Sequence, residues 1–191
     1  YLSSKNEDVI SLSIKSAKKI LNDKLKNKIS FLLFVSQTSP YKFPSISCIL
    51  QNELNLPRDI YAADINMGCS GYIYALKLAR SLEDLYNNRK YGLIICSDTY
   101  TKYIEDSDRT NKTIFSDGAS ATLVLRSKKK CLGNFLMGTD GSGYKDLIVE
   151  NGASRTGFKN DKKVNLFMNG AKIFMFTIAN IPKNIEKLLT I

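Results

Sequence analysis

Cys69 is the residue whose type and neighbours best suit covalent chemistry. It stands between Gly68 and Ser70-Gly71, so it lies on a sharp turn that a substrate can approach closely. Strand-like residues precede the turn and helix-like residues follow it, and the start of a helix stabilises a thiolate. The pattern matches a nucleophile elbow with sulfur in place of oxygen. The spacing alone leaves a small buried cysteine, the usual state of a free cysteine, as the alternative.

The absence of histidine excludes several kinds of catalytic site within these 191 residues. A Ser/His/Asp triad, a Cys/His pair and a histidine metal ligand all require that side chain. The other cysteines, Cys48, Cys96 and Cys131, form no CxxC pair. This spacing argues against a zinc site and predicts a reduced, cytoplasmic protein without a bound metal.

The composition is that of an ordinary globular domain, with 43% hydrophobic and 24% charged residues. No apolar run is long enough to span a membrane. The net charge of +10 could favour phosphates, nucleic acid or an acidic protein. However, the lysines are spread along the chain and no basic motif is interleaved with aromatic residues. We therefore expect a solvated surface, with neither nucleic acid nor a membrane as a partner.

Alternating strands and helices must position Cys69. Short apolar runs predict buried parallel strands at residues 29–35, 60–65 and 91–96. A capping box at Ser4 and Glu7, followed by apolar residues at helical spacing, predicts a first helix that ends near Leu21. Two further helices are predicted at residues 45–54 and 72–86. This order predicts an α/β fold with right-handed crossovers.

The pattern changes after residue 110. Strands are expected at residues 113–116, 119–125 and 131–138, and a polar loop at 139–163 contains one short strand at 147–149. A closing helix is expected at residues 168–189, where Pro182 should kink or restart it. Because such a sheet would be bare at one edge, we expect the sequence to be one portion of a longer polypeptide.

Five motifs, in order, resemble those of β-ketoacyl-acyl-carrier-protein synthase III. Residues 61–72 (YAADINMGCSGY) resemble the nucleophile segment, and residues 38–45 (TSPYKFPS) are similar to the dimer-interface loop. The later matches are residues 108–110 with 115–121 (DRT and FSDGASA), 140–142 (DGS) and 168–170 (MNG). The resemblance implies a thiolase-like fold of two related α/β halves in five layers. Residues 1–165 would form the N-terminal half without its first strand, and residues 166–191 the truncated start of the C-terminal half.

The resemblance also implies a reaction. Cys69 would take an acyl group from acyl-CoA as a thioester, with acyl-CoA as substrate and no separate cofactor. Malonyl-acyl-carrier protein would then lose carbon dioxide, and its carbanion would attack that thioester to start fatty-acid synthesis. The protein would be a homodimer, which we expect to pair through residues 91–96 and the loop around Phe43.

Five further site residues follow from the resemblance, and four of them have a purely structural alternative. Phe43 would floor the partner's acyl pocket or anchor its own loop. Arg109 would touch the adenine end of coenzyme A or neutralise the neighbouring aspartates. Phe115 would line the pantetheine tunnel, and Met168 with Gly170 the acyl region, unless Phe115 and Met168 are core residues.

Two departures from the family limit the prediction. The family pairs its cysteine with a His and an Asn from the second half, and no residue here matches either. Ser116 and Ser120 replace two glycines of the FGDGAGA block. We therefore expect these 191 residues to be incompetent for condensation, although Cys69 can still be acylated. The alternatives are a thiolase-fold acyltransferase for another acceptor in secondary or surface-polysaccharide metabolism, and an inactive fragment that only dimerises.

Overall fold

The computed structural model describes residues 1–86, 89–129, 131–155 and 164–190 of the chain. The chain divides into two compact units. The first contains Tyr1–Thr101 and Ser116–Lys129, and the second contains Lys102–Phe115 and the chain from Lys130 onward. The boundary expected at residue 165 concerns the halves of a complete protein and stays a prediction.

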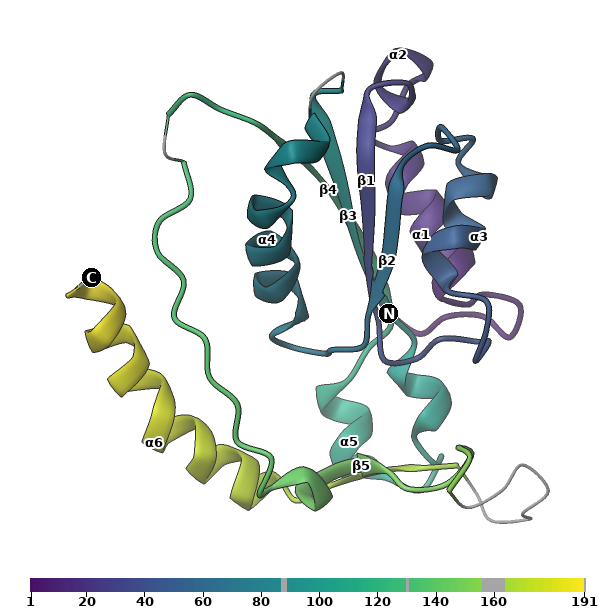
Figure 1. Ribbon diagram of the computed structural model, residues 1–191. Helices are drawn as coiled ribbons and strands as arrows, with labels where there is room; N and C mark the ends of the chain where they lie inside the picture. Colours follow the sequence, from purple (N-terminus) through teal and green to yellow (C-terminus); the bar gives the residue numbers. More distant parts are fainter. Residues whose placement is uncertain (87–88, 130, 156–163, 191) are drawn as a thin grey trace. The chain divides into compact units, whose positions relative to one another are not determined.

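A four-stranded sheet in the order β2-β1-β3-β4 forms the centre of the first unit. Strands β1 (Ile29–Val35), β2 (Tyr61–Ile65) and β3 (Tyr91–Asp98) are parallel, and β4 (Gly118–Leu125) runs antiparallel to β3. All four strands lie within or close to the predicted ranges. The carboxyl ends of β1, β2 and β3 meet at one edge of the sheet (Figure 1).

Helices cover both faces of this sheet. Helices α1 (Val9–Lys18) and α3 (Ile46–Glu53) lie on one face, and α4 (Gly71–Ser81) lies on the other (Figure 1). Along β1, Leu32 and Phe34 join the apolar cluster on the α1 and α3 face, while the alternate residues face α4. Because side chains alternate along a strand and both faces are covered, every residue of β1 is buried, and all but Ser30 are apolar. The short helix α2 (Asp23–Lys26) precedes β1.

The first helix begins later than the sequence predicted. Asp8 caps α1 by accepting a hydrogen bond from the Ser11 amide at 2.8 Å, and the Ser11 hydroxyl accepts one from the Asp8 amide at 2.9 Å. The capping box predicted at Ser4 and Glu7 is therefore wrong. Those two residues form a turn before the helix, in which the Ser4 amide donates to the Glu7 carboxylate.

Strand β3 lies inside the sheet, and this corrects the expected dimer contact. Its two edges are occupied by β1 and β4. Residues 91–96 therefore have no free backbone edge with which to pair a second chain. Within the described four-stranded sheet, the edge strands are β2 and β4.

The second unit contains α5 (Arg109–Ile114), η3 (Tyr144–Asp146), the antiparallel pair β5 (Leu147–Val149) and β6 (Leu166–Met168), and α6 (Gly170–Leu189). The predicted short strand is confirmed as β5. The strand expected at residues 113–116 is wrong, because α5 extends to residue 114. The Asp108 carboxylate caps the start of this helix. Residues 131–138 were also expected to form a strand, and the structure gives them no strand pairing.

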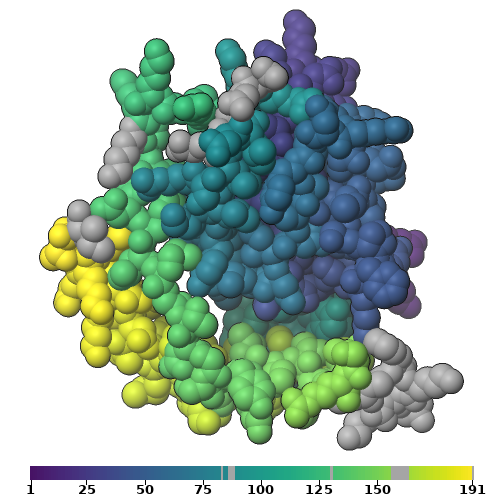
Figure 2. All heavy atoms as spheres, in the orientation of Figure 1, coloured from purple at the N-terminus to yellow at the C-terminus, as the bar shows by residue number. Residues whose placement is uncertain are grey.

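Helix α6 runs for 20 residues through Pro182, which does not restart it. None of its residues is buried, and its side chains lie at the surface in Figure 2, in yellow. In the parts of the chain that the structure describes, no helix has the length and apolarity needed to cross a membrane.

Candidate active site

Cys69 lies on the turn between β2 and α4. The Gly71 amide donates to the Gly68 carbonyl at 2.8 Å and closes the turn, and the Ile73 amide then donates to the Ser70 carbonyl at 3.0 Å. Cys69 is two residues before the first residue of α4, and its side chain is exposed. The predicted strand-turn-helix setting of Cys69 is thus confirmed, and the alternative of a small buried cysteine is not.

Both glycines of this turn are in close contact with other residues. A Cβ atom at Gly71 would lie 2.4 Å from Val35 Cγ1. A Cβ atom at Gly68 would lie 2.6 Å from Gln37 Oε1 and 2.8 Å from Tyr100 Oη. Any larger residue at either position would have to displace a neighbour or the turn itself, so glycine is needed here for space.

The half-buried carboxylate of Asp98 fixes the ends of β1 and β3 beside this turn. Asp98 Oδ1 accepts hydrogen bonds from the Ser36 hydroxyl, the Gln37 amide, and both the amide and the hydroxyl of Thr38, at 2.8–3.1 Å. The Thr99 amide in turn donates to the Thr38 hydroxyl at 2.8 Å. Burial raises the pKa of Asp98, although these hydrogen bonds oppose the effect. The network holds the backbone of residues 36–38 against the end of β3.

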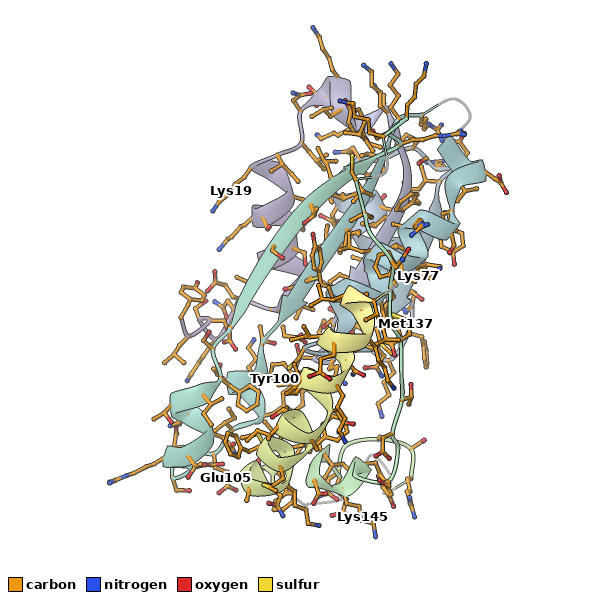
Figure 3. The ribbon with its side chains drawn as sticks, turned by 90° about the vertical axis from the view of Figure 1, so that its left-hand side faces the viewer. Lys19, Lys77, Tyr100, Glu105, Met137 and Lys145 are labelled. Atoms are coloured by element: carbon orange, nitrogen blue, oxygen red, sulfur yellow. The ribbon has the colours of Figure 1, made fainter. Side chains whose placement is uncertain are left out.

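Gln37 and Tyr100 meet over Gly68. The Tyr100 hydroxyl donates to Gln37 Oε1 at 2.7 Å. Tyr100, labelled in Figure 3, follows the carboxyl end of β3. Burial, then the charges of Asp98 and Cys69, raise the pKa of Tyr100 well above its usual range. The hydroxyl therefore keeps its proton at ordinary pH and remains a hydrogen-bond donor.

The other three cysteines differ in exposure, and none of the four, all of which the structure describes, forms a disulfide. Burial, helped by the charge of Asp98, raises the pKa of Cys96 to about 11, so its thiol is inert at neutral pH. Cys48 and Cys131 are exposed. In the described part of the chain, no cluster of three or more His, Cys, Asp or Glu side chains could hold a metal ion.

Phe43 lies in the loop between β1 and α3, and its side chain is 84% exposed. Asp64 on β2 fixes the end of that loop, because its carboxylate accepts hydrogen bonds from the amides of Ile46 at 2.7 Å and Ser47 at 2.8 Å. These bonds cap α3 with a charge from the neighbouring strand. An exposed phenyl ring on an anchored loop is available to another molecule.

Arg109 is exposed at the first position of α5 in the second unit. The nearby aspartates have other partners: Lys112 pairs with Asp106 at 2.5 Å, and the Asn111 amide donates to Asp108 at 2.9 Å. Among the residues that the structure describes, no ion pair reaches Arg109. Its alternative role, neutralising those aspartates, therefore finds no support.

The remaining predicted residues also belong to the second unit. Phe115 is half-buried at the end of α5. Met168 is half-buried opposite Leu147 in the β5-β6 pair, and Gly170 begins α6. A hollow of about 540 Å³ lies between residues 140–146 and the first turns of α6, lined among others by Tyr144, Ile173 and Phe176. Cys69 and Phe43 thus share one unit, and Arg109, Phe115, Met168 and Gly170 share the other.

Comparison with known proteins identifies relatives over nearly the whole chain. A family model for 3-oxoacyl-[acyl-carrier-protein] synthase III matches residues 63–141. The β-ketoacyl-[acyl-carrier-protein] synthase III of Clostridium perfringens is 32% identical over 190 residues, which cover 96% of this chain and 58% of the relative. That of Coxiella burnetii is 30% identical over 164 residues, which cover 84% and 49%. The chain spans about half the length of these curated relatives.

Solved structures agree. A crystal structure of a 3-oxoacyl-(acyl-carrier-protein) synthase III matches with a TM-score of 0.91 and 32% identity, over 99% of this chain and 61% of that one. A synthase from Burkholderia xenovorans matches with a TM-score of 0.84 and 32% identity, over 99% and 56%. The chain therefore has a thiolase-like α/β fold of the class found in acyl-condensing synthases. Within that class, its resemblance to the β-ketoacyl-acyl-carrier-protein synthase III family is confirmed.

Proposed function

We propose that this chain carries the acyl-accepting step of a β-ketoacyl-acyl-carrier-protein synthase III, with Cys69 as the nucleophile. The supporting observation is the exposed thiol of Cys69 on a tight glycine turn at the start of α4. That turn lies at the carboxyl ends of parallel strands, where α/β sheets bind their ligands. The Cys69 sulfur attacks the carbonyl carbon of acyl-CoA, forms a thioester, and releases coenzyme A, which takes up a proton.

The second step belongs to the complete protein. Malonyl-acyl-carrier protein loses carbon dioxide, and the resulting carbanion attacks the Cys69 thioester, which frees the thiol and forms the ketoacyl product. This step needs hydrogen-bond donors for the developing oxyanion. In the resembled family these donors would be a His and an Asn from the second half. These 191 residues contain no histidine, so we expect them to accept an acyl group without completing the condensation.

The other site residues would bind acyl-CoA. Arg109 is exposed and suited to the adenine end of coenzyme A. Phe115 would line the pantetheine path, and Met168 with Gly170 would border the acyl region. We propose acyl-CoA as the substrate and no separate cofactor.

We further propose a cytoplasmic homodimer. Edge strand β2 and the loop of Phe43 would form the contact, since Asp64 of β2 holds the end of that loop. The absence of a disulfide among the four cysteines, all of which the structure describes, suits a reducing compartment. Light scattering tests the dimer: a Phe43→Ala variant should shift the mass toward the monomer, and a wild-type mass of one chain would contradict the proposal.

Release of free coenzyme A tests the function. The chain, mixed with acetyl-CoA, should release a single burst of coenzyme A that approaches one equivalent per chain. Cys69→Ala should abolish the burst, whereas Cys48→Ala, which removes another exposed thiol, should leave it unchanged. A burst that survives in Cys69→Ala, or no burst from folded wild-type chain, would contradict the proposal.

A further inference from the structure

The hydrogen-bonded pair of Gln37 and Tyr100 lies against the turn that carries Cys69. The oxygen atoms of both side chains would be within 2.8 Å of a Cβ atom at Gly68, the residue immediately before the nucleophile. Cys69 is the next residue along this turn, and an electrostatic interaction links it to Tyr100, so the thiol lies close to the pair. An acyl group on Cys69 therefore extends into space that this pair borders.

Two carboxylates, one half-buried and one buried, hold the backbone beside both members of the pair in place. The Gln37 amide donates to Asp98 at 2.8 Å. The residue after Tyr100, Thr101, donates from its amide at 3.0 Å and from its hydroxyl at 2.5 Å to Asp117, whose side chain is buried. These bonds fix the backbone at Gln37 and directly after Tyr100, and the hydrogen bond between the two side chains holds them together at 2.7 Å, so the pair forms a fixed wall.

The chemistry of the wall disfavours a long apolar chain. The Tyr100 hydroxyl stays protonated and donates to Gln37 Oε1 at 2.7 Å. An alkyl chain forced between these groups would break that bond and offers no polar atom to replace it, which is costly. A short acyl group would end before it met them.

We propose that Gln37 and Tyr100 determine acyl-chain specificity at Cys69, admitting short acyl groups such as acetyl and propionyl and excluding longer ones. This inference rests on the proposed acyl transfer. In that step the bond between Cys69 Sγ and the acyl carbon forms as the bond between that carbon and the coenzyme A sulfur breaks.

The space beside Cys69 can be measured without acyl-CoA by alkyl methanethiosulfonates from methyl to hexyl. The Cys69 sulfur displaces methanesulfinate and forms a mixed disulfide with the alkylthio group. Peptide mapping gives the rate at Cys69 relative to exposed Cys48 in the same chain, which corrects for reagent reactivity. From methyl to hexyl the relative rate should fall by about tenfold or more, the discrimination typical of a confined pocket.

Two variants should remove this length dependence, Tyr100→Leu and Gln37→Ser. The second variant provides the test if the first fails to fold, as judged by circular dichroism. Tyr91→Leu, at the opposite end of β3, is the matched control and should keep the wild-type profile. Equal wild-type rates for methyl and hexyl reagents, or an unchanged slope in the folded variants, would overturn the inference.

Competition between acetyl-CoA and hexanoyl-CoA for the same chains separates this inference from the proposed function. The variants should raise the hexanoyl share of the Cys69 thioester by about tenfold. If the variants change the length dependence of the methanethiosulfonate rates but no acyl-CoA reacts, Gln37 and Tyr100 do border the space at Cys69 and the proposed acyl transfer is wrong. If acetyl-CoA reacts but the variants leave the length profile unmoved, acyl transfer stands and the specificity role is wrong.

Discussion

Asp98 holds Thr38 twice through a single oxygen atom. Its Oδ1 accepts from the Thr38 amide at 3.1 Å and from the Thr38 hydroxyl at 2.9 Å. The same oxygen accepts from Ser36 and Gln37, so four hydrogen bonds converge on it beside the Cys69 turn. The relationship joins the carboxyl ends of β1 and β3.

This convergence predicts a difference between two substitutions of Asp98. Asn can keep an acceptor at Oδ1, and burial already raises the pKa of the carboxyl, so the loss of charge costs little. Asp98→Asn should therefore lower the free energy of unfolding by about 1 kcal/mol or less. Asp98→Ala should lower it by about 3 kcal/mol, because the four groups that donate to Oδ1 lose their acceptor. Urea denaturation measures both, and equal losses would show that the bonds to Oδ1 are unimportant.

Gly71→Ala should disturb the nucleophile turn. The new methyl group would lie 2.4 Å from Val35 Cγ1 in the core under α4. We expect a loss of about 1–3 kcal/mol of stability, typical of overpacking, together with slower alkylation of Cys69. Gly118→Ala is the matched control, because a Cβ atom there meets nothing within 4 Å. Similar losses in both variants would contradict the packing argument.

The N-terminal segment should show a pH-dependent contribution to stability. Hydrogen bonds from Lys15, Ser4 and Tyr1 lower the pKa of Glu7 to about 2. A carboxyl whose folded pKa is lowered stabilises the fold above its unfolded pKa of about 4.3, and that contribution is lost as the pH falls toward about 2. Glu7→Gln should melt below wild type near neutral pH, and the gap should close in acid. A gap that persists near pH 2 would point to packing instead.

Iodoacetamide should label the four cysteines in a fixed order. Cys69 should react first because its exposed side chain lies on the open turn before α4, and the exposed Cys48 and Cys131 should follow. Cys96 should remain unlabelled in folded protein, since its pKa is raised to about 11. Brief labelling followed by peptide mapping checks the order, and faster labelling of Cys48 than of Cys69 would contradict it.

The sequence predicted the elements around Cys69 because their signals are local. Apolar runs marked β1 and β3, and the glycines around Cys69 marked the turn. Strand order is not local, so residues 91–96 were expected to pair with a second chain although β4 occupies that edge. Residues 113–116 looked like a strand because the cap from Asp108 that starts α5 was overlooked.

Gln37 and Tyr100 were missed for a related reason. Neither belongs to a motif, and only the fold brings them to Gly68 from the ends of two different strands. One signal was available: each lies two residues beyond the end of its strand, and residues beyond the carboxyl ends of parallel strands line the sites of α/β folds.

The central claim is that Cys69 accepts the acyl group, and peptide mapping of the acylated chain tests it most directly. The folded 191-residue chain would be incubated with isotopically labelled acetyl-CoA, quenched in acid to preserve thioesters, digested, and analysed by tandem mass spectrometry. Our account predicts the label on the peptide that contains Cys69, with Cys48, Cys96 and Cys131 unmodified. Label on another cysteine, or on none, would contradict it.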